Sequence, residues 1–175
     1  DEHGPFDIIG DVHGCCDELE ALLQRLGYVA TTLGSDDHLW GRPAYSHPER
    51  RKAVFVGDLV DRGPRVVDSV RLVRNMVKLG SALCVPGNHD MKLMRKLRGK
   101  DVQITHGLAE SLAEIDALPD DIREPFSKEL AEFLDGLVSH YVLDDGKVVV
   151  AHAAMKAEMQ GRGSGKVRDF ALYGE

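Results

Sequence analysis

Three short polar cassettes, each of which follows a short apolar run in the sequence, constrain the fold of this 175-residue chain more than any other feature. Short apolar runs separated by helical patterns of leucine and valine predict alternating strands and helices, which defines an α/β fold. In open α/β sheets, ligands bind beyond the carboxyl ends of the strands, so we expect the cassettes to converge on one sheet edge. The cassettes are residues 10–14 (GDVHG), 57–63 (GDLVDRG) and 87–90 (GNHD). They follow the predicted strands over residues 6–9, 53–56 and 83–85.

The remaining segments fill in this alternation. Leucines over residues 19–26 predict a helix that stops at Gly27, and Pro64 suits the start of the next helix. Residues 107–137 are expected to be mostly helical with a break near Pro119. The other predictions are a loop or irregular insert over 30–52, a helix that follows Gly87 and runs through Leu97, a fourth strand over 147–151, and a glycine-rich tail from 155 to 175.

Composition places the chain among single-domain globular proteins, with 43% hydrophobic and 29% charged residues. No apolar run is long enough for a membrane span and no secretion signal is visible, and three cysteines fit a reducing cytoplasm better than a disulfide framework. The net charge of −7 weakens the case for a nucleic-acid substrate. It does not exclude one, because bound cations would reverse the local sign of carboxylates in a metal site.

The first cassette offers a pair of metal ligands. On an extended segment, Asp11 and His13 stand two residues apart, so their side chains point the same way. A carboxylate with an imidazole suits a borderline divalent ion such as Mn, Fe, Ni or Zn. Taken alone, the pair is equally consistent with a surface turn that carries a stray histidine.

The second cassette is suited to bridging two metal ions and binding phosphate. Asp58 can offer one carboxylate oxygen to each of two ions roughly 3.5–4 Å apart, the spacing that clamps a phosphoryl displacement. Arg62 carries a planar fork of donors that fits a phosphate. The alternative for Arg62 is a structural ion pair with a nearby aspartate.

The third cassette adds a ligand and a candidate proton donor. Asn88 supplies a neutral carbonyl oxygen, and His89 could protonate a leaving oxygen if Asp61 orients it. A hydrogen bond with no chemical role is the alternative for His89. His152 follows the fourth predicted strand, and its place on the same sheet edge makes it a further metal ligand.

The other polar motifs receive simpler interpretations. The remaining histidines, His106 and His140 among them, lack cassette neighbours and are taken as surface or core residues. The basic cluster from Lys92 to Lys100 is interpreted as a solvated helix face, although it could steer a polyanionic substrate. Residues 161–166 do not have the order of a phosphate-binding P-loop.

Together, the three cassettes resemble the calcineurin-like metallophosphoesterase superfamily, in particular its branch with serine/threonine phosphatases and diadenosine tetraphosphatases. The resemblance implies an α/β/β/α sandwich and a two-metal phosphoesterase site. Asp11, His13 and Asp58 would hold one ion, and Asp58, Asn88 and His152 the other. His89, Arg62 and Asp61 would be the catalytic residues.

Longer stretches resemble the central phosphatase module of bacterial polynucleotide kinase-phosphatases. These stretches are residues 4–15, 51–58, 82–90 and 167–174. The likeness implies removal of 2′,3′-cyclic, 2′- or 3′-phosphates from RNA ends during RNA repair, with Mn²⁺ or Ni²⁺. It also implies flanking kinase and ligase-like modules in a parent chain and a possible RNA-repair partner protein.

This chain departs from the family pattern in one respect. The family has a further ligand histidine in a downstream Gly-His-Thr-like motif, and the sequence reaches Glu175 without one. We therefore expect residues 1–175 to be a phosphatase domain that lacks its C-terminal part and is weakly active or inactive alone. The alternatives are a serine/threonine protein phosphatase, a diadenosine tetraphosphatase-like hydrolase, and a non-catalytic scaffold fragment with the same fold.

Overall fold

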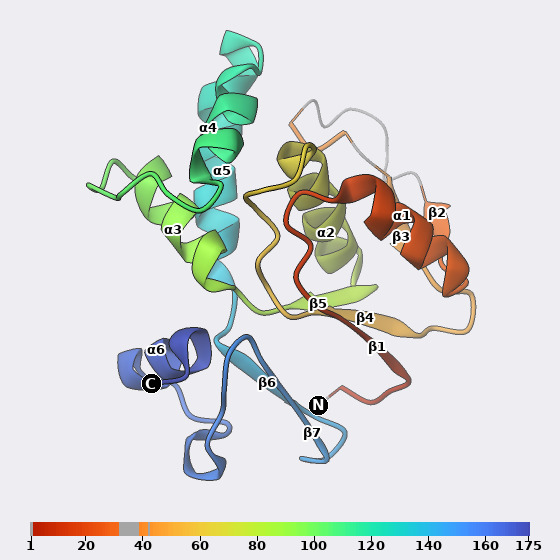
Figure 1. Ribbon diagram of the computed structural model, residues 1–175. Helices are drawn as coiled ribbons and strands as arrows, with labels where there is room; N and C mark the ends of the chain where they lie inside the picture. The colour runs from red at the N-terminus through yellow and green to blue at the C-terminus, as the bar shows by residue number, and fades with distance from the viewer. Residues whose placement is uncertain (1, 32–38, 42) are drawn as a thin grey trace.

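The computed structural model describes residues 2–31, 39–41 and 43–175, and a three-stranded parallel sheet lies at its centre (Figure 1). The strands β1 (Phe6–Ile9), β4 (Lys52–Phe55) and β5 (Ala82–Cys84) are hydrogen-bonded in that order. Since all three run the same way, their carboxyl ends meet at one edge, as the sequence predicts. The α/β fold class is confirmed.

Helices and a second small sheet cover opposite sides of this sheet (Figure 1). Helices α1 (Cys16–Arg25) and α2 (Val66–Leu79) lie on one side, and the antiparallel hairpin of β6 (His140–Leu143) and β7 (Val148–Ala151) lies on the other. The remaining described helices are α3 (Asn88–Leu97), α4 (Leu108–Asp116), α5 (Asp120–Gly136), the short 3₁₀ helix η1 (Ala157–Met159) and α6 (Gly165–Tyr173).

Side-chain alternation along β4 produces two separate cores. Ala53 and Phe55 point into the main core with the helices, whereas Val54 points into a smaller core between the two sheets. Val54 packs there with Val85, Leu143 and Val150. All three β4 side chains are fully buried, which explains the uninterrupted apolar run at this position in the sequence.

A glutamate from α4 closes the amino end of α2. Glu114 accepts hydrogen bonds from the backbone N–H groups of Val66 and Val67, at 2.6 and 3.0 Å. These donors have no partner within a helix, so the carboxylate caps the helix. Burial raises the pKa of Glu114, and the two backbone hydrogen bonds oppose that rise. Helices α2 and α4 are thereby tied together behind the second cassette.

Several sequence predictions were wrong in detail. Residues 30–52 are not simply an irregular insert, because β2 (Val29–Thr31) and β3 (Ala44–Ser46) pair antiparallel; residues 32–38 and 42 lie outside the described residues. Two elements were missed, strand β6 and helix α6, whose N-cap Ser164 accepts a hydrogen bond from Val167 N. Short or half-exposed elements such as these bury too little apolar surface to leave a clear periodic pattern.

The fourth predicted strand lies in a different sheet from the one expected. Strand β7 pairs with β6 and is not hydrogen-bonded to the parallel sheet. His152 therefore approaches the site from the second layer instead of sharing the strand edge with the cassettes. Among the described helices, none combines the length and the apolar character that a membrane crossing requires.

Candidate active site

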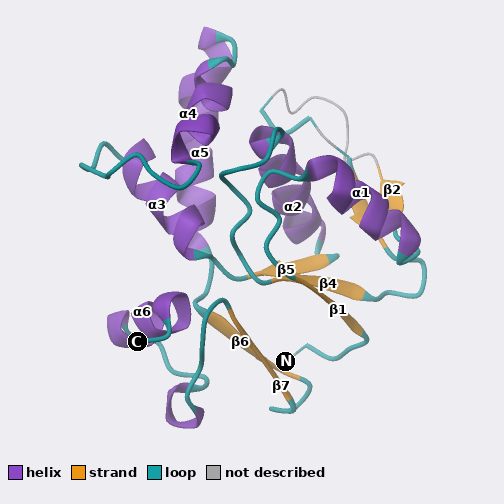
Figure 2. Ribbon diagram, in the orientation of Figure 1, coloured by secondary structure: helices purple, strands orange, loops and turns teal. Residues whose placement is uncertain are grey.

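The first and second cassettes form interlocked loops beyond the carboxyl ends of β1 and β4, drawn as loops in Figure 2. The backbone N–H groups of Val12 and His13 donate to the carbonyl of Asp58, at 3.0 and 2.8 Å, and Gly63 N donates to the carbonyl of His13 at 2.8 Å. Val12 and His13 of the first cassette are thus hydrogen-bonded to the backbone of the second. The loops form one rigid unit before any side chain is considered.

The backbone of this unit is in the left-handed region at four functional positions. The φ angles are 45° at His13, 51° at Asp58, 70° at Asp61 and 69° at Arg62. Residues other than glycine rarely adopt such angles, and they concentrate at functional sites where the surrounding structure holds them. The extended geometry expected for Asp11 and His13 is therefore wrong: His13 lies in a turn after β1.

Glycine at the third cassette is required by close packing. A Cβ atom at Gly87 would lie 2.0 Å from Oδ1 of Asp58 and 2.3 Å from its backbone N, and one at Gly57 would lie 2.3 Å from Gly87 N. No larger side chain fits between these loops. The two glycines bring the carboxylate of Asp58 against the start of α3.

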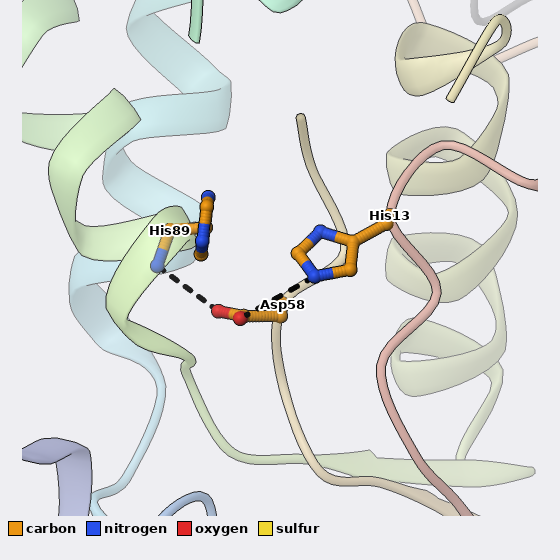
Figure 3. Close-up of side chains that lie close together, drawn as sticks. All are labelled: His13, Asp58 and His89. Atoms are coloured by element: carbon orange, nitrogen blue, oxygen red, sulfur yellow. Dashed lines mark hydrogen bonds and ion pairs between the residues drawn. The ribbon is translucent and has the colours of Figure 1, made fainter. Parts of the chain in front are cut away.

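Asp58 lies at the centre of two groups of potential metal ligands, and Figure 3 shows its carboxylate between His13 and His89. One group is His13, Asp58 and His89, and the other is Asp11, Asp58 and His152; within each, the ligand atoms lie within 4.8 Å of one another. Asp58 Oδ2 is 3.7 Å from the Nε2 atoms of both His13 and His152. The structure thus brings the predicted metal ligands together, and it also places His89 within reach.

The polar atoms of His13 fit a bound cation. Its Nδ1 lies 2.7 Å from the carbonyl oxygen of Val60, which can only accept, so Nδ1 carries the proton. Its Nε2 is buried, has no hydrogen-bond partner within the described part of the chain, and lies 3.7 Å from Oδ2 of Asp11. The Nε2 lone pair therefore faces the carboxylates of Asp11 and Asp58 with no proton between them. A divalent ion bound at this point would be coordinated by all three groups.

His152 repeats this arrangement at the same oxygen of Asp58, since its Nε2 also lies 3.7 Å from Oδ2. Its Nδ1 lies 2.8 Å from the carbonyl oxygen of Val56, and its Nε2 lies 2.9 Å from Oδ1 of Asn88. With the proton held at Nδ1, the Nε2 lone pair faces an amide oxygen. A cation or an additional proton between Nε2 of His152 and Oδ1 of Asn88 would bind both acceptor atoms. Asn88 and His152 are therefore suited to hold a second ion.

His89 lies in a different hydrogen-bond environment from the other two imidazoles. Its Nδ1 is 2.6 Å from Oδ2 of the fully buried Asp61, and its Nε2 is 3.3 Å from Nη2 of Arg62. Its backbone N–H donates to Oδ1 of Asp58 at 3.0 Å. The predicted contact between Asp61 and His89 is therefore present, with Arg62 on the far side of the ring.

Asp90, the last residue of the third cassette, was missed as a supporting residue. Its two carboxylate oxygens accept hydrogen bonds from Leu59 N and Gly87 N, both at 2.8 Å, and its side chain is completely buried. Burial raises its pKa to about 7, with a smaller contribution from the nearby carboxylate of Asp58. The residue ties the second cassette to the third.

Two further supporting residues come from the segment behind α3. Ser111 on α4 contacts Asp61, and Gly107 packs so tightly that a Cβ atom there would lie 2.5 Å from Arg62 N. No local sequence signal identifies either one, because both are some 45 to 50 residues from their partners in the chain. His106, interpreted from the sequence as a surface or core residue, is exposed, and its Nδ1 lies 2.9 Å from the hydroxyl oxygen of Thr105.

Comparison with known proteins agrees with this geometry. The sequence model of the calcineurin-like phosphoesterase family matches residues 4–173. The chain is 41% identical over 170 residues to the bis(5′-nucleosyl)-tetraphosphatase PrpE [asymmetrical] of Geobacillus thermodenitrificans, and 39% identical to that of Bacillus subtilis. Each match covers 97% of this chain; the chain spans 65% and 66% of the length of these relatives, respectively.

Solved structures show the same fold. A crystal structure described as that of a candidate diadenosine tetraphosphatase is 28% identical with a TM-score of 0.54, over 91% of this chain and 53% of that one. A serine/threonine phosphatase from Saccharomyces cerevisiae, 16% identical, has a TM-score of 0.59 over 89% of this chain and 40% of its own, and supports the fold alone. The predicted superfamily is thus confirmed, and the chain belongs to the calcineurin-like phosphoesterase family.

Proposed function

We propose that the protein is a metal-dependent phosphohydrolase that cleaves dinucleoside tetraphosphates asymmetrically, into a nucleoside monophosphate and a nucleoside triphosphate. The observation that carries the proposal is the set of potential metal ligands gathered around Asp58, whose Oδ2 lies 3.7 Å from Nε2 of both His13 and His152. The tetraphosphatase names of relatives at 39–41% identity support the choice of substrate. They favour this substrate over the RNA ends expected from the sequence.

The family implies divalent ions, and the ligand set favours ions that accept both oxygen and imidazole nitrogen, of which we propose Mn²⁺ or Ni²⁺. Asp11, His13 and Asp58 would hold one ion, and Asp58, Asn88 and His152 the other. When bound, the ions would supply Lewis acidity, which neutralises phosphoryl oxygens and lowers the pKa of a water molecule.

The protein's own residues complete the chemistry. The guanidinium of Arg62 would donate to phosphoryl oxygens, and its fork of N–H groups orients them for in-line attack. His89 would give the proton at its Nε2 to the oxygen of the departing nucleotide. Asp61 orients the ring for this transfer by accepting a hydrogen bond from Nδ1 of His89. The proton that the attacking water loses passes to solvent, and His89 regains one proton from solvent, so the proton count of the hydrolysis balances.

A second basic residue, one helical turn from His89 on α3, suits a substrate with several phosphates. Lys92 lies one helical turn beyond His89 on α3, so their side chains are neighbours. Its ammonium contacts the carbonyl and the hydroxyl oxygen of Thr105, at 3.2 and 2.7 Å, and within the described part of the chain it has no carboxylate partner. Because that charge is not neutralised, it is available to phosphates beyond the one that is attacked.

A substrate panel tests the proposal on the full-length gene product. Diadenosine tetraphosphate, an RNA with a 2′,3′-cyclic phosphate end and a phosphoserine peptide would be compared by kcat/KM with Mn²⁺, with product identification. We expect diadenosine tetraphosphate to be preferred and to yield AMP and ATP. Preference for the RNA end would restore the RNA-repair interpretation, and preference for the peptide would indicate a protein phosphatase.

Arg62→Ala and Lys92→Ala separate the two basic residues within this panel. Arg62→Ala should lower kcat/KM for every substrate, because its group contacts the phosphoryl group that reacts. Lys92→Ala should raise KM for the tetraphosphate and leave a nitrophenyl monoester unaffected. A neighbouring cation, Arg95, is exposed on the same helix, and Arg95→Ala is the matched control for loss of surface charge.

A further inference from the structure

Ser111 makes two hydrogen bonds to a single residue of the site, although it lies in α4 outside all three cassettes. Its hydroxyl donates to Oδ1 of Asp61 at 2.6 Å and accepts from Asp61 N at 2.9 Å. The side chain is fully buried, and so is that of Asp61. A hydroxyl carries one proton, so accepting from the backbone N–H leaves that proton for the carboxylate.

Hydrogen bonds from Ser111 and His89 together determine the orientation of the Asp61 carboxylate. Oδ1 is held by Ser111 and Oδ2 contacts Nδ1 of His89 at 2.6 Å, so rotation of the carboxylate would break both contacts. The backbone of Asp61 has φ of 70°, an unfavourable angle for an aspartate that Ser111 helps to hold through the N–H group.

We propose that Ser111 is a positioning residue for the proton donor, acting on His89 through Asp61. The inference rests on the proposed function, in which His89 protonates the leaving oxygen. Helix α4 thereby contributes to the chemistry of loops that lie about 50 residues earlier in the chain. Without the serine, the carboxylate could turn away from His89, and the imidazole would lose the hydrogen-bond partner that fixes its orientation.

Leaving-group dependence distinguishes this role from a purely structural one. Phenyl phosphate has a poor leaving group that needs protonation, whereas the leaving group of 2,4-dinitrophenyl phosphate departs without it. Loss of the proton donor therefore slows the first ester selectively. General loss of folding or of metal ions slows both esters alike.

The experiment compares kcat for the two esters in the full-length protein with Mn²⁺. In Ser111→Ala we expect kcat for phenyl phosphate to fall about tenfold or more, in line with the typical contribution of a general acid, and kcat for the dinitrophenyl ester to change less than about twofold. Ser111→Cys preserves the volume and offers a weak donor, so it should give an intermediate ratio. It also provides a variant that folds if the alanine change proves too disruptive.

A buried serine elsewhere supplies the matched control. Ser69 on α2 is equally buried, and its hydroxyl has no hydrogen-bond partner among the described residues. Ser69→Ala should leave the ratio of the two esters at the wild-type value. In an Asp61→Asn background, Ser111→Ala should produce no further change in the ratio, because the residue through which it acts is already lost.

The outcomes separate the two levels of inference. An unchanged ratio in both Ser111 variants, or an equal further loss in the Asp61→Asn background, would overturn the positioning role while the phosphohydrolase proposal stands. A wild-type protein that binds Mn²⁺ but hydrolyses neither diadenosine tetraphosphate nor either ester would overturn the proposed function, and the role of Ser111 would fall with it.

Discussion

His152 Nε2 lies 2.9 Å from Asn88 Oδ1, although these residues follow strands of different sheets. Asn88 begins the helix that follows the parallel sheet, and His152 follows the last strand of the β6–β7 hairpin. The contact spans the two layers, so docking of the second sheet adds His152 to the ligand set. The site therefore belongs to the assembled sandwich and not to the parallel sheet alone.

Replacement of His152 should impair one of the two ions selectively. We expect His152→Ala to lower activity by about 100-fold or more at limiting Mn²⁺, since loss of even a supporting partner of a metal ligand costs up to about 100-fold. Excess Mn²⁺ should restore part of the activity. The measurement is activity against metal concentration, with the exposed His3→Ala as control. An unchanged metal requirement would remove His152 from the ligand set.

Metal binding should stabilise the fold through Asp58. An ion that binds the native state at 100 times its Kd adds about 2.7 kcal/mol to the free energy of unfolding, so Mn²⁺ should raise the melting temperature of the wild-type protein. Asp58→Asn should abolish both this rise and the activity, because both ligand groups include Asp58. Asp121→Asn, an exposed change in α5, should retain both. Full Mn²⁺ stabilisation of the Asp58 variant would contradict the shared-ligand arrangement.

A Cβ atom at position 107 should displace Arg62. Gly107 has φ of 95° and Gly80 has φ of 77°, but an added Cβ meets Arg62 N at 2.5 Å in the first case and nothing within 4 Å in the second. Both alanine variants should lose stability from backbone strain. Only Gly107→Ala should also lose activity, by about 100-fold if Arg62 moves by roughly 1 Å. Similar kcat/KM values in the two folded variants would refute the contact.

Asp7 should stabilise the fold in a pH-dependent manner. It accepts hydrogen bonds from both Nε and Nη2 of Arg51, the first at 2.9 Å, and from the hydroxyl of Tyr28 at 3.0 Å. The hydrogen bonds from Arg51 lower its pKa below the usual 3.8. Since the folded pKa is depressed, the stabilisation is fully present above pH 3.8 and is lost as pH falls through the folded value.

The corresponding variant is Asp7→Asn. At pH 7 it should lower the free energy of unfolding by about 2 kcal/mol, the size of a hydrogen bond to a charged group. The difference from wild type should shrink when urea unfolding is repeated near pH 3. An equal difference at both pH values would show that the charge of Asp7 contributes nothing.

Much of the site was predictable because the candidate ligand residues and the glycines that permit tight turns are adjacent in the sequence. In residues 57–63, for example, Gly57 permits the close loop packing, Asp58 is the shared ligand and Arg62 the phosphate contact. Apolar strands on one side of each cassette and amphipathic helices on the other fixed the α/β class from local periodicity. The contact between Asp61 and His89 followed from the same residues.

The rest depended on distant parts of the chain. The sequence alone determined the fold class, the superfamily and the identity of the candidate ligands, because these are expressed in contiguous residues. Only the tertiary structure decided that His152 arrives from a second sheet, and that Asp90, Gly107 and Ser111 hold the cassettes in place. For His152, Gly107 and Ser111 the physical reason is chain separation: partners that meet through packing of different elements leave no periodic or local pattern in the sequence.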